Sequence, residues 1–94
     1  MSFKRVLQGG GFSKTEIAVL YGVSRQTVHT WAAGGSPRPG SYTERMAKVI
    51  TTALVGAMDK RILPLGAMER EARSTRIKSM SRTLQGLKPA PITD

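Results

Sequence analysis

The sequence contains no cysteine and only one histidine, His29, among its 94 residues. The absence of cysteine excludes disulfide bonds, thiolate ligands for zinc and a cysteine nucleophile. One histidine by itself cannot form a structural zinc site. No catalytic group of residues is recognisable, so we expect a protein that is not an enzyme and holds no metal or cofactor. A chain without cysteine also suits a reducing compartment, and we expect a cytoplasmic location.

Long apolar runs and acidic residues are scarce as well. The longest uncharged apolar run is far shorter than the roughly 20 residues that cross a membrane. The two adjacent apolar residues before Gly9 are too few for a signal peptide. Lysine and arginine number 15 against 6 aspartate and glutamate, which gives a formal net charge of +9. Each third of the chain is positive, so the charge does not belong to a single tail. A small basic protein of this kind predicts a polyanionic partner and no membrane.

Apolar residues recur with helical spacing along most of the chain, and no segment shows the sustained alternation of a β-strand. We therefore predict an all-α fold, a small domain of about five helices. The expected helices cover residues 2–8, 14–21, 25–33, 42–58 and 64–85.

Two of these helices begin with the spacing of a capping box. Ser13 and Glu16 stand three residues apart, as do Ser41 and Glu44. In a capping box each side chain accepts a hydrogen bond from the backbone N–H of the other residue. Gly22 follows the first of the two helices and is suited to the left-handed conformation that ends a helix.

The most informative feature is the pair of short helices on either side of Gly22. A tight turn between two helices needs a small residue at the crossing, which Ala18 provides, and a glycine four residues later. Apolar residues must then hold the helices together on their inner faces. Those positions carry Ile17, Val23, Val28, Trp31 and Ala32.

The segment 14–31 resembles the helix-turn-helix of the Cro/repressor-type DNA-binding proteins of bacteria and phages. That family has an apolar-Ala pair, a Gly-Val-Ser turn, an apolar residue four positions after the serine and often a tryptophan three further on. All of these positions match. The resemblance implies a lambda-repressor-like helical domain that binds double-stranded DNA. The residues alone leave open an ordinary helical hairpin in a small bundle.

The resemblance implies that residues 24–33 form a recognition helix that enters the major groove. Ser24 would cap this helix and offer its backbone N–H to a phosphate. Arg25 would form two hydrogen bonds to guanine, and Gln26 would do the same to adenine.

The remaining implied contacts are less specific. Thr27 and Thr30 would contact a phosphate or a thymine methyl group, and His29 a base edge or a phosphate. Lys14 and Arg38 would bind phosphates. For His29, Lys14 and Arg38 the alternative is a solvent-exposed side chain without a partner.

Other basic and aromatic residues favour structural interpretations. Trp31 is spaced for the buried face of its helix, although a lone tryptophan in a basic protein could also stack on single-stranded bases. Glu69 and Arg73 have the spacing of an ion pair on a solvated helix face. DNA contact is the alternative for the basic residues of this segment, which are Arg70, Arg73, Arg76, Lys78 and Arg82.

The sequence divides into a DNA-binding domain over residues 1–62, a C-terminal helix within 63–87 and a flexible tail over 88–94. The C-terminal helix is expected either to form a homodimer interface or to complete the core of the monomer. Its apolar positions are Leu65, Met68, Ala72, Ile77, Met80, Leu84 and Leu87.

Three functions are compatible with these features. We favour a dimeric transcriptional regulator of phage or bacterial type that recognises a specific DNA sequence. The alternative is a DNA-recognition subunit of a nucleoprotein assembly, such as a small terminase subunit or an excisionase-like factor, in which a higher oligomer is expected. A helical interaction module without a role in nucleic acid binding is the third.

Overall fold

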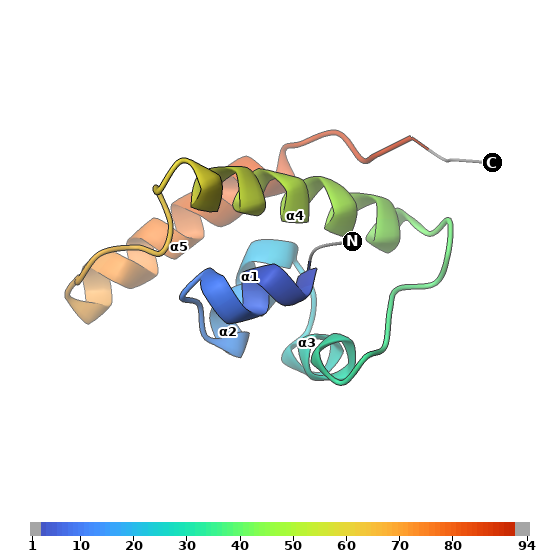
Figure 1. Cartoon of the computed structure of the whole chain (residues 1–94), viewed down its shortest axis with the longest axis horizontal. Helices are drawn as coiled ribbons and strands as arrows, with labels where there is room; N and C mark the ends of the chain where they lie inside the picture. Colours follow the sequence, from blue (N-terminus) through green and yellow to red (C-terminus); the bar gives the residue numbers. More distant parts are fainter. Residues whose placement is uncertain (1–2, 92–94) are drawn as a thin grey trace.

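The computed structural model describes residues 3–91 and contains five α-helices and no strand within that range (Figure 1). The predicted all-α fold class is therefore confirmed. The helices are α1 (Phe3–Gly9), α2 (Lys14–Tyr21), α3 (Arg25–Ala32), α4 (Tyr42–Asp59) and α5 (Arg70–Gln85). Over the described residues, none of the five has the length and apolarity that crossing a bilayer requires.

Helix α2 begins and ends as the sequence predicts. The Glu16 N–H donates to Ser13 Oγ at 3.1 Å, and the Ser13 N–H donates to Glu16 Oε1 at 2.9 Å, which completes the capping box. At the other end Gly22 has a φ of 66°, and its N–H donates to the carbonyls of Ala18 and Val19. A residue with a side chain would be strained in this left-handed conformation.

The second predicted capping box forms only in part. The Glu44 N–H donates to Ser41 Oγ at 3.2 Å, as expected. However, Glu44 Oε1 accepts a hydrogen bond from the Gly40 N–H at 2.9 Å rather than from Ser41. Gly40 has a φ of 76°, and this turn presents its own N–H to the carboxylate. The carboxylate therefore supports the loop before α4.

The C-terminal helix begins at Arg70, six residues later than predicted. In one continuous helix from Pro64, Met68 would lie nine residues before Ile77, which is two and a half turns and so the opposite face. Met68 instead lies in an irregular segment and is 44% exposed, so the predicted place of this side chain on an inner helix face is wrong. Leu63 is buried in the core just before this segment.

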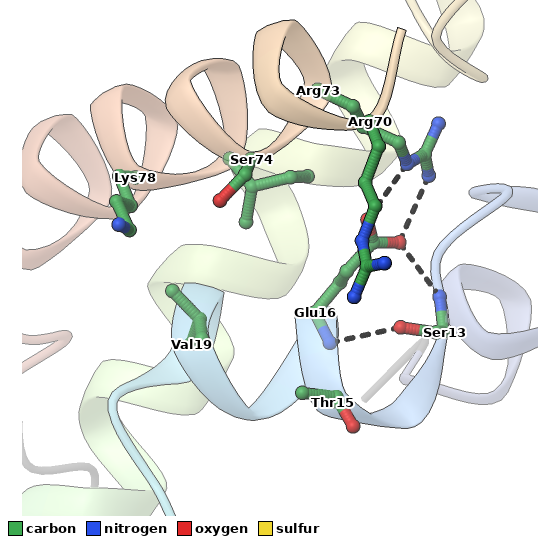
Figure 2. A pocket seen from close by; sticks show the side chains of 9 residues that line it. Ser13, Thr15, Glu16, Val19, Arg70, Arg73, Ser74 and Lys78 are labelled. Carbon is green, nitrogen blue, oxygen red and sulfur yellow. Dashed lines mark hydrogen bonds and ion pairs between the residues drawn. The ribbon is translucent and has the colours of Figure 1, made fainter. Parts of the chain in front are cut away.

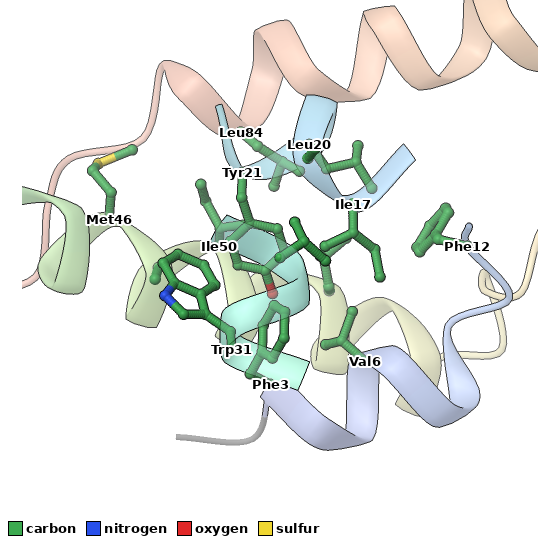
Figure 3. Packing of buried hydrophobic residues seen from close by; sticks show 14 of the residues in the cluster. Phe3, Val6, Phe12, Ile17, Leu20, Tyr21, Trp31, Met46, Ile50 and Leu84 are labelled. Atoms are coloured by element: carbon green, nitrogen blue, oxygen red, sulfur yellow. The ribbon is translucent and has the colours of Figure 1, made fainter. Parts of the chain in front are cut away.

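Three aromatic side chains join the first three helices in the core (Figure 3). The ring of Phe3 packs edge-on against Tyr21, with centroids 5.3 Å apart, and against Trp31 at 5.4 Å. Tyr21 and Trp31 complete the triangle at 6.2 Å. Trp31 is 7% exposed, which confirms its predicted place in the core.

Tyr21 also connects α2 to α4. Its hydroxyl lies 2.8 Å from Oγ1 of Thr51, which is the buried polar residue of α4. Burial raises the pKa of Tyr21 to about 12, and the hydrogen bond with Thr51 opposes this shift. The phenol is therefore neutral in the folded protein and has its hydrogen-bond partner inside the core.

Helix α5 packs along α2 through apolar and polar contacts. Ile77 and Leu84 are buried in the common core, so this face of α5 completes the core of the monomer. The Ser81 hydroxyl donates to the Val19 carbonyl, and Gln85 Nε2 donates to the Leu20 carbonyl, both at 2.8 Å. Both carbonyls belong to the last turn of α2, where backbone donors run out, and the Val19 carbonyl accepts a second hydrogen bond from the Gly22 N–H.

Arg73 does not form the predicted ion pair with Glu69. Its Nε and Nη2 atoms donate to the two carboxylate oxygens of Glu16 at 2.7 and 2.9 Å, and Nη2 also donates to the Gly11 carbonyl. The spacing in sequence was compatible with a pair within α5, but Glu16 offers a carboxylate already oriented by its capping box. The guanidinium lowers the pKa of Glu16, and the hydrogen bond from Ser13 adds to the effect.

The last described residues, 88–91, are not helical, and the Ala90 N–H donates to the Arg45 carbonyl of α4 at 3.3 Å. This contact places the start of the predicted tail against α4. The rest of that tail, residues 92–94, and residue 2, the first of the helix predicted over 2–8, lie outside the described residues.

We predict that acid weakens the attachment of α5 to α2. The pKa of Glu16 is lower in the folded protein than its ordinary value of 4.5, so its contribution to stability is present above pH 4.5 and is lost as the pH falls through the folded value. Replacing Arg73 by methionine should cost about 1–2 kcal/mol at neutral pH. Urea unfolding of both proteins as a function of pH measures this difference, which should shrink below pH 4.5. A difference independent of pH would contradict the assignment.

Candidate DNA-binding surface

The turn between α2 and α3 is built from Gly22, Val23 and Ser24. The Val23 N–H donates to the Ala18 carbonyl at 3.0 Å, which closes the end of α2. Ser24 then has an extended conformation, and its Oγ accepts a hydrogen bond from the Thr27 N–H at 3.1 Å. Ser24 therefore caps α3 as predicted, and the order of helix, tight turn and helix is present.

Helix α3 has one buried face and one exposed face. Val28 is fully buried and Trp31 nearly so, and these two side chains hold the helix against the core. The side chains on the opposite face are exposed. They include Arg25, Gln26, His29 and Thr30.

One predicted inner-face residue of this helix is exposed. Ala32 was expected beside Val28 and Trp31, but it is the last residue of α3 and is exposed. The inner face of α3 is thus limited to two residues. Its outer face is correspondingly broad for a helix of eight residues.

The structure brings together two predicted DNA contacts that are 15 residues apart. Lys14 Nζ, at the start of α2, lies 3.3 Å from Nδ1 of His29 on α3. An ammonium group has only donors, so Nδ1 accepts, and the ring proton of the neutral imidazole is on Nε2. This arrangement leaves Nε2–H as a donor, and His29 is exposed.

The two threonine hydroxyls of α3 have partners within the helix. Thr27 Oγ1 lies 2.9 Å from Ser24 Oγ, and the residue is only half-exposed. Thr30 Oγ1 donates to the Gln26 carbonyl at 3.1 Å. Thr30 is exposed, so its methyl group and the remaining lone pairs of its oxygen are accessible. Of the two, Thr30 is the better placed to contact a ligand.

Arg38 lies apart from these residues, in the loop between α3 and α4. Its side chain is exposed, while the neighbouring Pro37 is buried and attaches the loop to the body of the domain. The Arg38 carbonyl accepts a hydrogen bond from the Ser41 N–H. Within residues 3–91, no hydrogen bond or ion pair joins the Arg38 side chain to α3.

Three acidic residues within 3–91 form ion pairs elsewhere in the fold. Glu16 pairs with α5, while the carboxylates of Glu44 and Asp59 pair with Lys48 and Arg5. In the part of the chain that is described, no carboxylate lies within ion-pair distance of Lys14, Arg25 or Arg38. The surface around α3 therefore carries positive charge without local compensation, as binding to a polyanion requires.

In Figure 1, α3 lies at the lower edge of the molecule, α4 lies along the upper edge, and α5 rises from the left to pass behind α4. No family model, curated protein or solved structure matches the chain. The function of this surface therefore has to be inferred from its own residues and contacts.

We predict that Ser24 is needed for the order of α3. Replacing Ser24 by alanine removes the hydrogen bond to the Thr27 N–H and should cost about 1 kcal/mol, or a fall in Tm of about 4–8 °C. Ser36→Ala is the matched control, because Ser36 is exposed in the loop after α3 and should change stability by less than about 0.5 kcal/mol. Thermal unfolding followed by circular dichroism measures both. Equal Tm values for the two variants would show that Ser24 does not cap the helix.

Proposed function

We propose that this protein binds double-stranded DNA at a specific sequence by placing α3 in the major groove, as a transcriptional regulator of phage or bacterial type. The observation that carries this proposal is the separation of the two faces of α3. Val28 and Trp31 are buried, while the outer face presents only polar groups in its first two turns. A major groove is wide enough to admit an α-helix, and base edges are read there by such polar side chains.

Two side chains in the first turn of α3 would carry the sequence preference. Arg25 and Gln26 are both exposed, and each can form a bidentate pair with one type of base, guanine and adenine respectively. His29 lies one turn after Arg25 and offers its Nε2–H as a further donor. All three side chains thus lie in the first two turns of α3, next to the turn that joins it to α2.

Other residues would bind the DNA backbone without reading its sequence. Lys14 is held beside α3 by its contact with His29 and lacks a carboxylate partner within the described residues. Arg38 is exposed in the next loop. Cations at such positions fix the register of a protein on DNA and make binding sensitive to salt. The formal net charge of +9 would add long-range attraction to the duplex.

We predict that Arg25→Ala and Lys14→Ala have different effects on DNA binding. Arg25→Ala should cost about 1–3 kcal/mol on the preferred site and relax the preference at one or two base pairs. Lys14→Ala should weaken binding to all sequences alike and reduce the slope of log K against log salt by about one. Selection of sites from a random duplex pool, followed by titration of the selected site at several salt concentrations, measures both.

Lys60→Ala serves as the control for the loss of one positive charge, because Lys60 is exposed at the end of α4. The placement of the recognition helix is wrong if Arg25→Ala selects the same consensus as the parent protein. The proposed function itself is wrong if the parent protein shows no binding to random or genomic duplexes at about 50 mM salt.

We also propose that the protein acts as a homodimer, because a single short helix reads too few base pairs to select one site among the 10⁶–10⁹ of a genome. The buried residues of α5, Ile77 and Leu84, belong to the monomer core, so the interface would use a different surface. We predict a dimer by native mass spectrometry and a selected site with two half-sites about one helical turn apart. A ring of eight or more copies would instead favour a subunit of a nucleoprotein assembly.

A further inference from the structure

A groove of about 390 Å³ lies on the surface of the protein where α2 and α5 meet (Figure 2). Side chains from both helices line it. Arg70 extends from the first turn of α5 toward the first turn of α2, and Lys78 projects from α5 two turns further on (Figure 2). Hydroxyl groups complete the lining, from Ser13, Thr15 and Ser74.

The cations of this groove outnumber its carboxylates. Glu16 is the acidic residue of the lining, and both of its oxygens already accept hydrogen bonds from Arg73. Arg70 and Lys78 are exposed, and no carboxylate within residues 3–91 forms an ion pair with either of them. Arg70 and Lys78 therefore give the groove two positive charges that form no ion pair within the described residues.

The groove adjoins the surface around α3 at the start of α2. Lys14 and Thr15 are consecutive residues of that helix, and consecutive side chains of an α-helix point about 100° apart. Lys14 faces His29 of α3, while Thr15 lines the groove beside α5. A DNA strand in contact with Lys14 would thus next reach Thr15 and Arg70.

The polar groups that line the groove are of the kinds that bind a phosphate. The exposed side chains of the lining are two cations and three hydroxyls, with Val19 as the exposed hydrophobic residue, while Ile77 is 4% exposed. Arginine, lysine, serine and threonine are the side chains that most often contact DNA phosphates.

We propose that the groove between α2 and α5 binds the DNA backbone through Arg70 and Lys78, outside the base pairs that α3 reads. This inference rests on the proposed function. Arg70 and Lys78 would hold the duplex against α2. The part of the DNA strand in contact with the protein would then extend beyond Lys14. The contact carries no sequence preference of its own, because phosphates are the same at every base pair.

The test compares two double variants of the full chain that remove the same charges. Arg70→Gln with Lys78→Gln changes the groove. Arg76→Gln with Lys60→Gln is the matched control, because Arg76 lies on the side of α5 that faces α4 and Lys60 ends α4. All four side chains are exposed, so both proteins should keep the parent Tm. Each is titrated with the selected duplex over a range of salt concentrations, and with duplexes carrying ethylated phosphates.

We expect the groove variant to bind about ten-fold more weakly than the control at 0.1 M salt, with a salt slope smaller by about two. Its selected consensus should be unchanged. Ethylation of phosphates flanking the half-site should weaken the parent and the control but not the groove variant. Equal affinities, equal slopes and equal ethylation patterns for the two double variants would overturn this inference and leave the proposed function intact. Absence of any duplex binding by the parent protein would overturn both.

Discussion

The packing of Trp31 against Phe3 and Tyr21 is the interaction on which the rest of the candidate site depends. Helix α3 has only eight residues, and a helix of this length is not stable by itself in water. Its two buried side chains, Val28 and Trp31, are what hold it in place. Because the aromatic rings meet edge to face, they define an orientation as well as a distance. The directions of Arg25 and His29 on the other face follow from this orientation.

Helix α2, which carries Tyr21, connects this aromatic packing to the rest of the domain. It contacts α3 through the turn at Gly22, α4 through the hydrogen bond of Tyr21, and α5 through polar contacts at both of its ends. Helix α5 is poor in apolar residues and rich in arginine, and its buried side chains are Ile77 and Leu84. The hydrogen bonds from Arg73 and Gln85 add specific attachment points. Because this face of α5 is buried against the rest of the domain, it is not available to a second copy of the chain.

The local signals in the sequence were sufficient for most of the helix boundaries. A serine cap, a glycine and a capping carboxylate act within a few residues, and the structure contains the predicted ends of α2 and the predicted beginnings of α3 and α4. The start of α5 could not be predicted in the same way. Pro64 is compatible with a first helical turn, but the helix begins at Arg70, and its buried residues, Ile77 and Leu84, lie further along.

The sequence by itself determined the helical class of the fold, the turn at Gly22 and the burial of Trp31, because each depends on backbone preferences or on apolar spacing within one segment. Only the tertiary structure decided which partners the charged side chains have. Glu16 and Arg73 are 57 residues apart, and Lys14 and His29 come from different helices. Long charged side chains reach several neighbours, so sequence spacing alone does not select among them. Their partners depend on how α2, α3 and α5 pack.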